Sequence, residues 1–248
     1  MTSPQQEEQV RKYYQTLYTA WGPQHWWPAR TAFEVIVGAY LTQNTSWKNV
    51  EAALRNLRRA HALSAAAIRK IPIAELEHLI RPAGYFRQKA ARLKIFVAFV
   101  DSRYGGSLTR MFMEPTGKLR QELLELHGVG AETADSILLY AGQHEIFVVD
   151  AYARRILDRH GILPDKAADE EIRTLFERAL SGITRDLHRT GSGQPVHAHK
   201  PSPVSLLERS RLAQVYNDMH GLIVAAGKRY CRKSKPQCEG CPLQKFLS

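Results

Sequence analysis

Apolar residues recur at three- and four-residue steps along most of the chain. The clearest runs are Phe33, Val37, Tyr40 and Leu41, then Val50, Leu54 and Leu57, and later Leu93, Phe96, Val97 and Val100. This spacing places apolar side chains on one face of a helix. Residues 145–149 resemble a strand, but so short a run is equally well an extended connector. The pattern predicts an all-α fold.

One stretch interrupts this periodicity. Residues 185–205 are rich in Gly, Ser, Pro and His and have no apolar period. We expect a flexible surface insert within a domain there. His197 and His199 in this insert could bind a metal, although solvated loop histidines are far more common.

Composition adds a preference for a partner. The 248 residues include 35 Lys plus Arg against 24 Asp plus Glu, a net charge of +11, and 44% are hydrophobic. The hydrophobic content supports a folded core and one large or two small domains. No apolar run reaches the roughly 20 residues of a membrane span, and the polar N-terminus lacks a signal-peptide core. We therefore expect a cytoplasmic, nucleoid-associated protein with no membrane partner, and nucleic acid is the leading candidate partner.

A glycine-containing hairpin precedes the most informative part of the chain. Residues 126–131 read LHGVGA, so that Gly128, Val129 and Gly130 join two predicted helices. Glycines there allow a tight turn and a close approach to the backbone amides, and the following helix directs its positive dipole end outward. The segment predicts a phosphate contact, and the alternative is a plain linker between helices.

An aspartate follows the apolar run 146–149. Asp150 stands where a helix N-cap belongs, and capping is its simplest explanation. The same position at a helix N-terminus keeps a carboxylate ionised beside apolar neighbours. Such an anion can stabilise a cationic transition state or activate a water.

The order of these motifs resembles the helix-hairpin-helix DNA glycosylases of the endonuclease III superfamily. The matching segments are LTQNT at 41–45, GYFRQKA at 84–90, LHGVGAETA at 126–134, VVD at 148–150 and the C-terminal cysteines. The resemblance runs from about Trp21 to the C-terminus, excluding 185–205. It implies a two-lobed monomer with its active site in the groove between a six-helix domain, 25–144, and a second domain, 1–24 with 145–248.

The resemblance also implies roles for single residues. Double-stranded DNA containing damaged bases is the expected partner, contacted by Gly128, Val129, Gly130, Lys89 and Arg154. Gln43 corresponds to the wedge residue that fills the gap left by a flipped nucleotide. The alternative for Gln43 is a glutamine on a helix surface.

Glu132 stands where bifunctional members of the family carry a lysine. That lysine attacks the sugar and forms a Schiff base, which a carboxylate cannot do. We therefore expect a monofunctional glycosylase that uses Asp150 and a water, with Glu132 in the catalytic set. Glu132 is equally explained as a residue that pairs with the helix dipole.

The N-terminal aromatic residues resemble the 3-methyladenine branch of the family. Trp26, Trp27, Pro28 and Trp47 are the expected walls of the base pocket, although core packing also explains buried tryptophans. Alkylated purines carry positive charge and attract aromatic faces. An alkylated purine such as 3-methyladenine is the predicted substrate. The alternatives are a glycosylase for mismatched or oxidised pyrimidines, such as uracil or thymine opposite guanine, and a non-catalytic damage-sensing protein.

The three cysteines have an incomplete cluster spacing. Cys231, Cys238 and Cys241 match the first three ligands of the family's [4Fe–4S] loop, but Leu247 stands at the fourth. We expect a degenerate loop at 231–247 that contacts phosphates through its basic residues, and chemistry that requires no cofactor. A labile cluster, or zinc held with His220, is the alternative.

Overall fold

The computed structural model describes residues 2–183 and 200–247, and within these ranges all regular structure is helical. The predicted all-α class is confirmed, and residues 145–149 form an extended connector. Most of the predicted insert, including His197 and His199, lies outside the described residues. Among the described helices, none combines the length and the apolar character that crossing a bilayer requires.

The chain divides into two compact units. The terminal unit comprises Met1–Pro28 and Gln143–Ser248, and the central unit comprises Ala29–Gly142. The sequence placed the corresponding boundaries after residues 24 and 144. Each unit buries its own apolar core, as expected for chain segments of this size.

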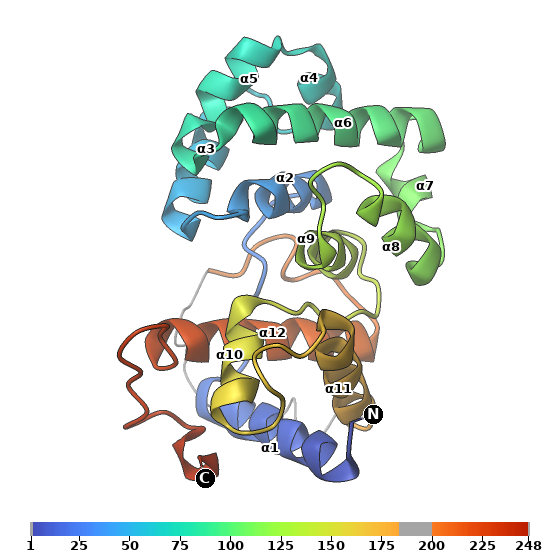
Figure 1. Cartoon of the computed structure of the whole chain (residues 1–248). Coiled ribbons are helices and arrows are strands. Elements are labelled where there is room, and N and C mark those ends of the chain that lie inside the picture. The colour runs from blue at the N-terminus through green and yellow to red at the C-terminus, as the bar shows by residue number, and fades with distance from the viewer. Residues whose placement is uncertain (1, 184–199, 248) are drawn as a thin grey trace. The chain divides into compact units, whose positions relative to one another are not determined.

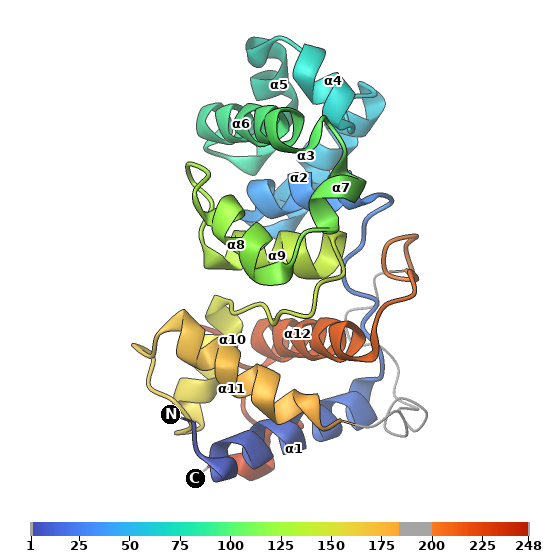
Figure 2. The same cartoon turned by 90° about the vertical axis from the view of Figure 1, so that its right-hand side faces the viewer.

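The described part of the terminal unit is built around one long helix. Its elements are α1 (Pro4–Trp21), α10 (Ala151–Arg159), α11 (Asp169–Ser181), α12 (Arg211–Arg229) and the 3₁₀ turn η4 (Gln244–Phe246). Helix α12 packs against α1, α10 and α11 (Figures 1 and 2). Its residues from 215 to 227 are buried on every side, which is the pattern of a helix at the centre of a domain.

The central unit is likewise built around a buried helix. Its elements are α2 (Ala32–Thr42), α3 (Trp47–Arg59), α4 (Ala65–Lys70), α5 (Ile73–Ile80), η1 (Arg81–Ala83), α6 (Phe86–Tyr104), α7 (Leu108–Phe112), α8 (Thr116–Leu124), α9 (Ala131–Ser136) and the π-helical turn η2 (Ile137–Ala141). Helix α2 is buried from Phe33 to Leu41 and contacts α3, α6, α9 and η2. Glu34 within it is paired with Arg58 of α3.

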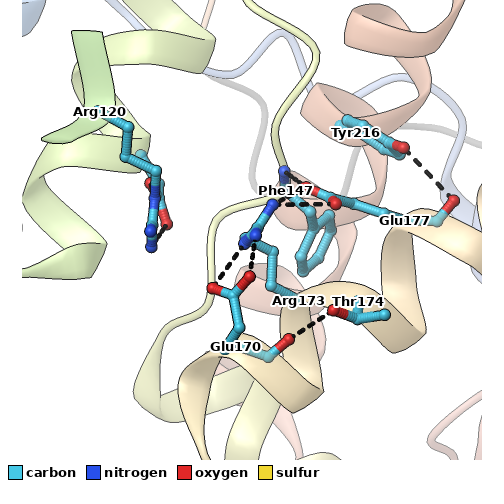
Figure 3. Close-up of polar contacts among 8 residues, drawn as sticks. Arg120, Phe147, Glu170, Arg173, Thr174, Glu177 and Tyr216 are labelled. Atoms are coloured by element: carbon cyan, nitrogen blue, oxygen red, sulfur yellow. Dashed lines mark hydrogen bonds and ion pairs between the residues drawn. The ribbon is translucent and has the colours of Figure 1, made fainter. Parts of the chain in front are cut away.

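The connector that leads to α10 is fixed at Phe147 (Figure 3). The Phe147 ring stacks on Phe176 of α11 with centroids 4.1 Å apart, and the Tyr216 ring of α12 meets the Phe147 ring edge-on with centroids 6.1 Å apart. The Phe147 N–H donates to Glu177 Oε1 at 3.0 Å, and Arg173 holds the same carboxylate. These contacts join the connector to α11 and α12, and thereby set where α10 begins.

Candidate active site

Asp150 caps α10, as the sequence predicts. Its Oδ1 accepts hydrogen bonds from the N–H groups of Tyr152 at 2.9 Å and Ala153 at 2.8 Å. The residue is extended, with φ −122°, and only 9% of it is exposed. The carboxylate is thus held at a helix N-terminus, with one oxygen satisfied by the backbone.

The surroundings of Asp150 keep it ionised. Burial raises the pKa of this carboxyl, but the nearby His220 imidazole and the amides of Ala153 and Tyr152 lower it, and the net pKa lies below the ordinary value. The His220 Nε2 lies 3.5 Å from Asp150 Oδ2. Asp150 is therefore an anion at neutral pH in a site largely shielded from water.

Helix α10 is held tightly along its length. A Cβ atom at Gly227 of α12 would lie 2.2 Å from Tyr152 Cδ1, so a glycine is needed for α10 to pack this closely. Further along, Arg155 donates to the Cys231 carbonyl at 2.7 Å, and Arg159 donates to the Arg232 carbonyl at 2.7 Å. The carboxylate at the start of this helix consequently has a rigid support.

Trp26, one of the predicted pocket residues of the terminal unit, lies beside the same helix α12. Trp26 and Trp27 are 8% and 4% exposed, and Pro28 is half-buried. The Lys228 ammonium lies 5.5 Å from the centre of the Trp26 ring, while Ser202 Oγ donates to the Trp27 carbonyl at 3.1 Å. A cation already contacts Trp26, so Trp27 and Pro28 are the better candidates for stacking on a charged base.

The hairpin lies in the central unit. Gly128 has φ +80°, a conformation that favours glycine, and Gly130 is extended at φ −98° and precedes α9. Glu132 is exposed in the first turn of α9. The two glycines therefore have different roles. Gly128 adopts the left-handed conformation that the turn needs, and Gly130 leaves the start of α9 without a capping side chain.

Gln43 is linked to the hairpin by its amide group. Its Nε2 donates to the Gly128 carbonyl at 2.9 Å and to Thr133 Oγ1 at 3.0 Å, and its Oε1 accepts from Arg92 at 2.6 Å. A Cβ at Gly128 would lie 2.0 Å from Arg92 Nε. Sequence reasoning missed Arg92, which contacts both the predicted wedge and the hairpin.

The predicted pocket residue Trp47 is the first residue of α3 and is half-buried.

The structure corrects the assignment of Lys89 as a DNA contact. Lys89 is 1% exposed, and its Nζ donates to the carbonyls of Leu41 at 2.9 Å and Ala83 at 2.8 Å. An ammonium committed to buried carbonyls cannot reach a phosphate. Arg154 is also engaged within the protein, with Asp169 and with the carbonyls of Asp165 and Ala167, and its DNA contact stays a prediction.

The cysteines do not complete a four-thiolate site. Cys231 is buried, Cys238 and Cys241 are half-buried, and Leu247 offers no ligand atom in the fourth position. Among residues 2–183 and 200–247, no group of three or more His, Cys, Asp or Glu side chains is arranged to hold a metal. These residues do not fit a standard cluster, and no step of the chemistry below passes through one.

The fold and the site together agree with one protein family. A family model for HhH-GPD superfamily base excision DNA repair proteins matches residues 37–181. The chain belongs to this superfamily of DNA glycosylases, which confirms the resemblance inferred from its motifs.

Individual relatives add detail. The chain is 42% identical to a Methanocaldococcus jannaschii protein that carries the provisional name DNA repair glycosylase MJ1434, over 96% of each. It is 30% identical to the 3-methyladenine DNA glycosylase MagIII of Helicobacter pylori bound to 1,N6-ethenoadenine, with a TM-score of 0.69 over 90% of this chain and 97% of that one. An endonuclease III–DNA covalent intermediate shares the fold, with a TM-score of 0.71 at 20% identity over 100% and 96% of the two chains.

Proposed function

We propose that this protein is a monofunctional DNA glycosylase that flips an alkylated purine, such as 3-methyladenine, out of double-stranded DNA and hydrolyses its N-glycosidic bond. The observation that carries the proposal is the Asp150 carboxylate. It is 9% exposed, its pKa is below the ordinary value, and Oδ1 is fixed by two backbone amides. A fixed and shielded anion suits a reaction that develops positive charge on a sugar.

The chemistry follows from the state of this carboxylate. As the bond between base and sugar lengthens, the electron pair leaves with the base and C1′ becomes cationic. Asp150 stabilises that cation and accepts a proton from the water that attacks C1′. A base that is already positively charged leaves as a neutral molecule, so the site requires no strong general acid and no cofactor.

The preference for an alkylated purine rests on two supports. Trp27 and Pro28 of the terminal unit carry apolar surfaces, which attract an electron-poor ring. The Helicobacter pylori relative is by name a 3-methyladenine DNA glycosylase, and its identity of 30% spans nearly the whole chain. Stacking is worth roughly 1–3 kcal/mol per base, and it needs few hydrogen bonds to the base edge.

DNA binding is supported by charge and by the hairpin. The net charge of +11 attracts a polyanion, and the amides around Gly128, Val129 and Gly130 suit a phosphate. Gln43, which is joined to the hairpin through the Gly128 carbonyl, is the proposed wedge for the gap left by the flipped base. Flipping costs a few kcal/mol, least for a damaged base, which adds selectivity.

The proposal is tested by identifying the bases released from methylated duplex DNA by mass spectrometry. Wild type should release 3-methyladenine, while Asp150→Asn should bind the duplex equally well and release base roughly 10²-fold more slowly. Asp158→Asn, which changes an exposed carboxylate on the same helix, is the matched control and should act like wild type. Unchanged release by Asp150→Asn contradicts the mechanism, and release of pyrimidines alone contradicts the substrate.

The monofunctional assignment has its own test, because a Schiff base can be trapped with borohydride. Wild type, with Glu132 in the first turn of α9, should give no covalent DNA adduct. Glu132→Lys restores an amine at that position and should give an adduct, whereas Glu125→Lys adds the same charge at an exposed site in α8's C-cap and should not. A strong adduct with wild type contradicts the assignment.

A further inference from the structure

His220 lies between two parts of the terminal unit that the proposed mechanism depends on. The residue is 5% exposed and belongs to the central helix α12. Its ring centroid is 6.3 Å from that of Phe147 with the planes at 75°, and its Nε2 is 3.5 Å from Asp150 Oδ2. The imidazole thus contacts both the connector and the carboxylate to which the connector leads.

The two oxygens of Asp150 have different surroundings. Two amide N–H groups bind Oδ1, and the imidazole faces Oδ2. A carboxylate offers about four lone-pair sites, two on each oxygen. With both positions on Oδ1 used and one on Oδ2 facing His220, a single direction on Oδ2 is left for a water or a sugar.

We propose that His220 is a positioning residue, whose Nε2–H directs Asp150 Oδ2 so that its remaining lone pair faces the reacting sugar and water. This inference rests on the proposed function. It requires a proton on the imidazole Nε2, and it assigns an electrostatic role to the 3.5 Å contact between Nε2 and Asp150 Oδ2.

The neighbours of His220 keep its direction fixed. A Cβ at the adjacent Gly221 would lie 3.0 Å from Gln24 Cβ, so α12 has no room to rotate there. The other nearby acid, Asp218, is two residues away and therefore about 200° around the helix. Asp218 interacts with Gln214 and Arg209, and the Asp150 carboxylate faces His220.

The test combines two substitutions in single-turnover base release and duplex binding. His220→Phe keeps a ring beside Phe147 and removes the donor, and His220→Gln keeps a donor. We expect His220→Phe to slow release about tenfold or more with DNA affinity unchanged, and His220→Gln to stay within about threefold of wild type. In the Asp150→Asn background, His220→Phe should cause no further loss, because a residue that acts through Asp150 has nothing left to position.

The outcomes that overturn the inference are equally specific. Two results would indicate a merely structural role for His220. One is an equal loss of base release in His220→Phe and His220→Gln, and the other is a full additional loss when His220→Phe is combined with Asp150→Asn. His160→Phe, which alters a half-buried histidine against Tyr13 at the other end of α10, is the control and should leave release unchanged. Melting curves check that each variant folds, and His220→Leu is used instead if His220→Phe does not fold.

A second readout does not depend on catalysis. In the DNA-free protein, the ¹³C titration of the Asp150 carboxyl should show a higher pKa in His220→Phe than in wild type. In His220→Gln the pKa of Asp150 should equal the wild-type value or lie between it and the His220→Phe value. If wild type released no base, the proposed function would fail while this titration still tested the contact. A titration that does not move in His220→Phe overturns the inference.

Discussion

Helices α10 and α9 begin at residues to which the proposed function assigns chemistry and DNA binding, and they begin differently. Helix α10 starts at Asp150, whose carboxylate takes the N–H groups of Tyr152 and Ala153. Helix α9 starts at Gly130, which has no side chain to offer. The first helix start is capped by the carboxylate of the chain itself, and the second has no capping side chain. In the proposed function, a helix N-terminus thus serves a reacting charge in one unit and a phosphate contact in the other.

In the proposed function, Asp150 both caps α10 and takes part in the chemistry. A capping carboxylate gains most from the helix amides when it is ionised, and ionisation is also what base release requires. At the hairpin, an acidic cap would oppose the binding of a phosphate. Gly130 therefore suits the proposed phosphate contact, and Asp150 suits the proposed cationic sugar.

The largest expected effect separates the two roles of Asp150. Asp150→Ser retains an N-cap oxygen of comparable quality but removes the charge. We expect the free energy of unfolding to stay within about 1 kcal/mol of wild type, and base release to fall roughly 10²-fold or more. Chemical denaturation and single-turnover release measure the two quantities. A variant that keeps its activity would show that capping alone is required.

The next largest effect is expected when a capping side chain is placed at Gly130, the N-cap of α9. Gly130 is extended, and a Cβ there would meet no atom within 4 Å, so Gly130→Asp fits without strain. We expect about tenfold weaker duplex binding at low salt, because the new anion repels the phosphate, and a smaller difference at high salt. Gly130→Asn, a neutral cap, is the control. Equal duplex affinity of Gly130→Asp and Gly130→Asn would show that the hairpin does not contact DNA.

A smaller effect distinguishes the two hairpin glycines. Gly128 has φ +80° and lies against Arg92, so Gly128→Ala should lower the free energy of unfolding by about 1–2 kcal/mol. Gly130→Ala needs neither a left-handed residue nor extra space, and should cost less than about 1 kcal/mol. Thermal or urea unfolding of the pair measures the difference. Equal costs would mean that the turn does not depend on Gly128.

The last prediction concerns the C-terminal end of a helix, where the dipole has the opposite sign. Lys89 binds the Leu41 carbonyl in the last turn of α2, and burial, with the charge of Arg92, lowers the pKa of Lys89 to about 8 from 10.5. Between these two pH values the unfolded chain binds more protons than the folded one, so the free energy of unfolding should rise with pH. Denaturation curves over this range should show that rise in wild type and in the control Lys94→Met, and not in Lys89→Met.

Local features were the ones that the sequence could predict. The cap at Asp150, the start of α9 after Gly130 and the extended connector each depend on neighbouring residues, and helical periodicity indicated the fold class. Asp150 itself was found through its place after an apolar run. These features lie within a few residues of one another, where turn and capping preferences apply.

Contacts between distant segments were missed. His220 lies 70 positions from Asp150, and Arg92 lies 49 positions from Gln43, so no spacing rule connects either pair. Lys89 was misread for a related reason. A lysine in a basic chain suggests a phosphate contact, and only packing shows that its ammonium is enclosed by two carbonyls.

The arginines of α10 connect the helix that carries the carboxylate at its N-terminus to the C-terminal segment. Arg155 and Arg159 bind the carbonyls of Cys231 and Arg232, so part of this segment cannot open without breaking charge-assisted hydrogen bonds to α10. The two should exchange their amide hydrogens as one cooperative unit. The cysteine segment can thus act as a structural support without a metal, because its local unfolding would loosen the helix that Asp150 caps.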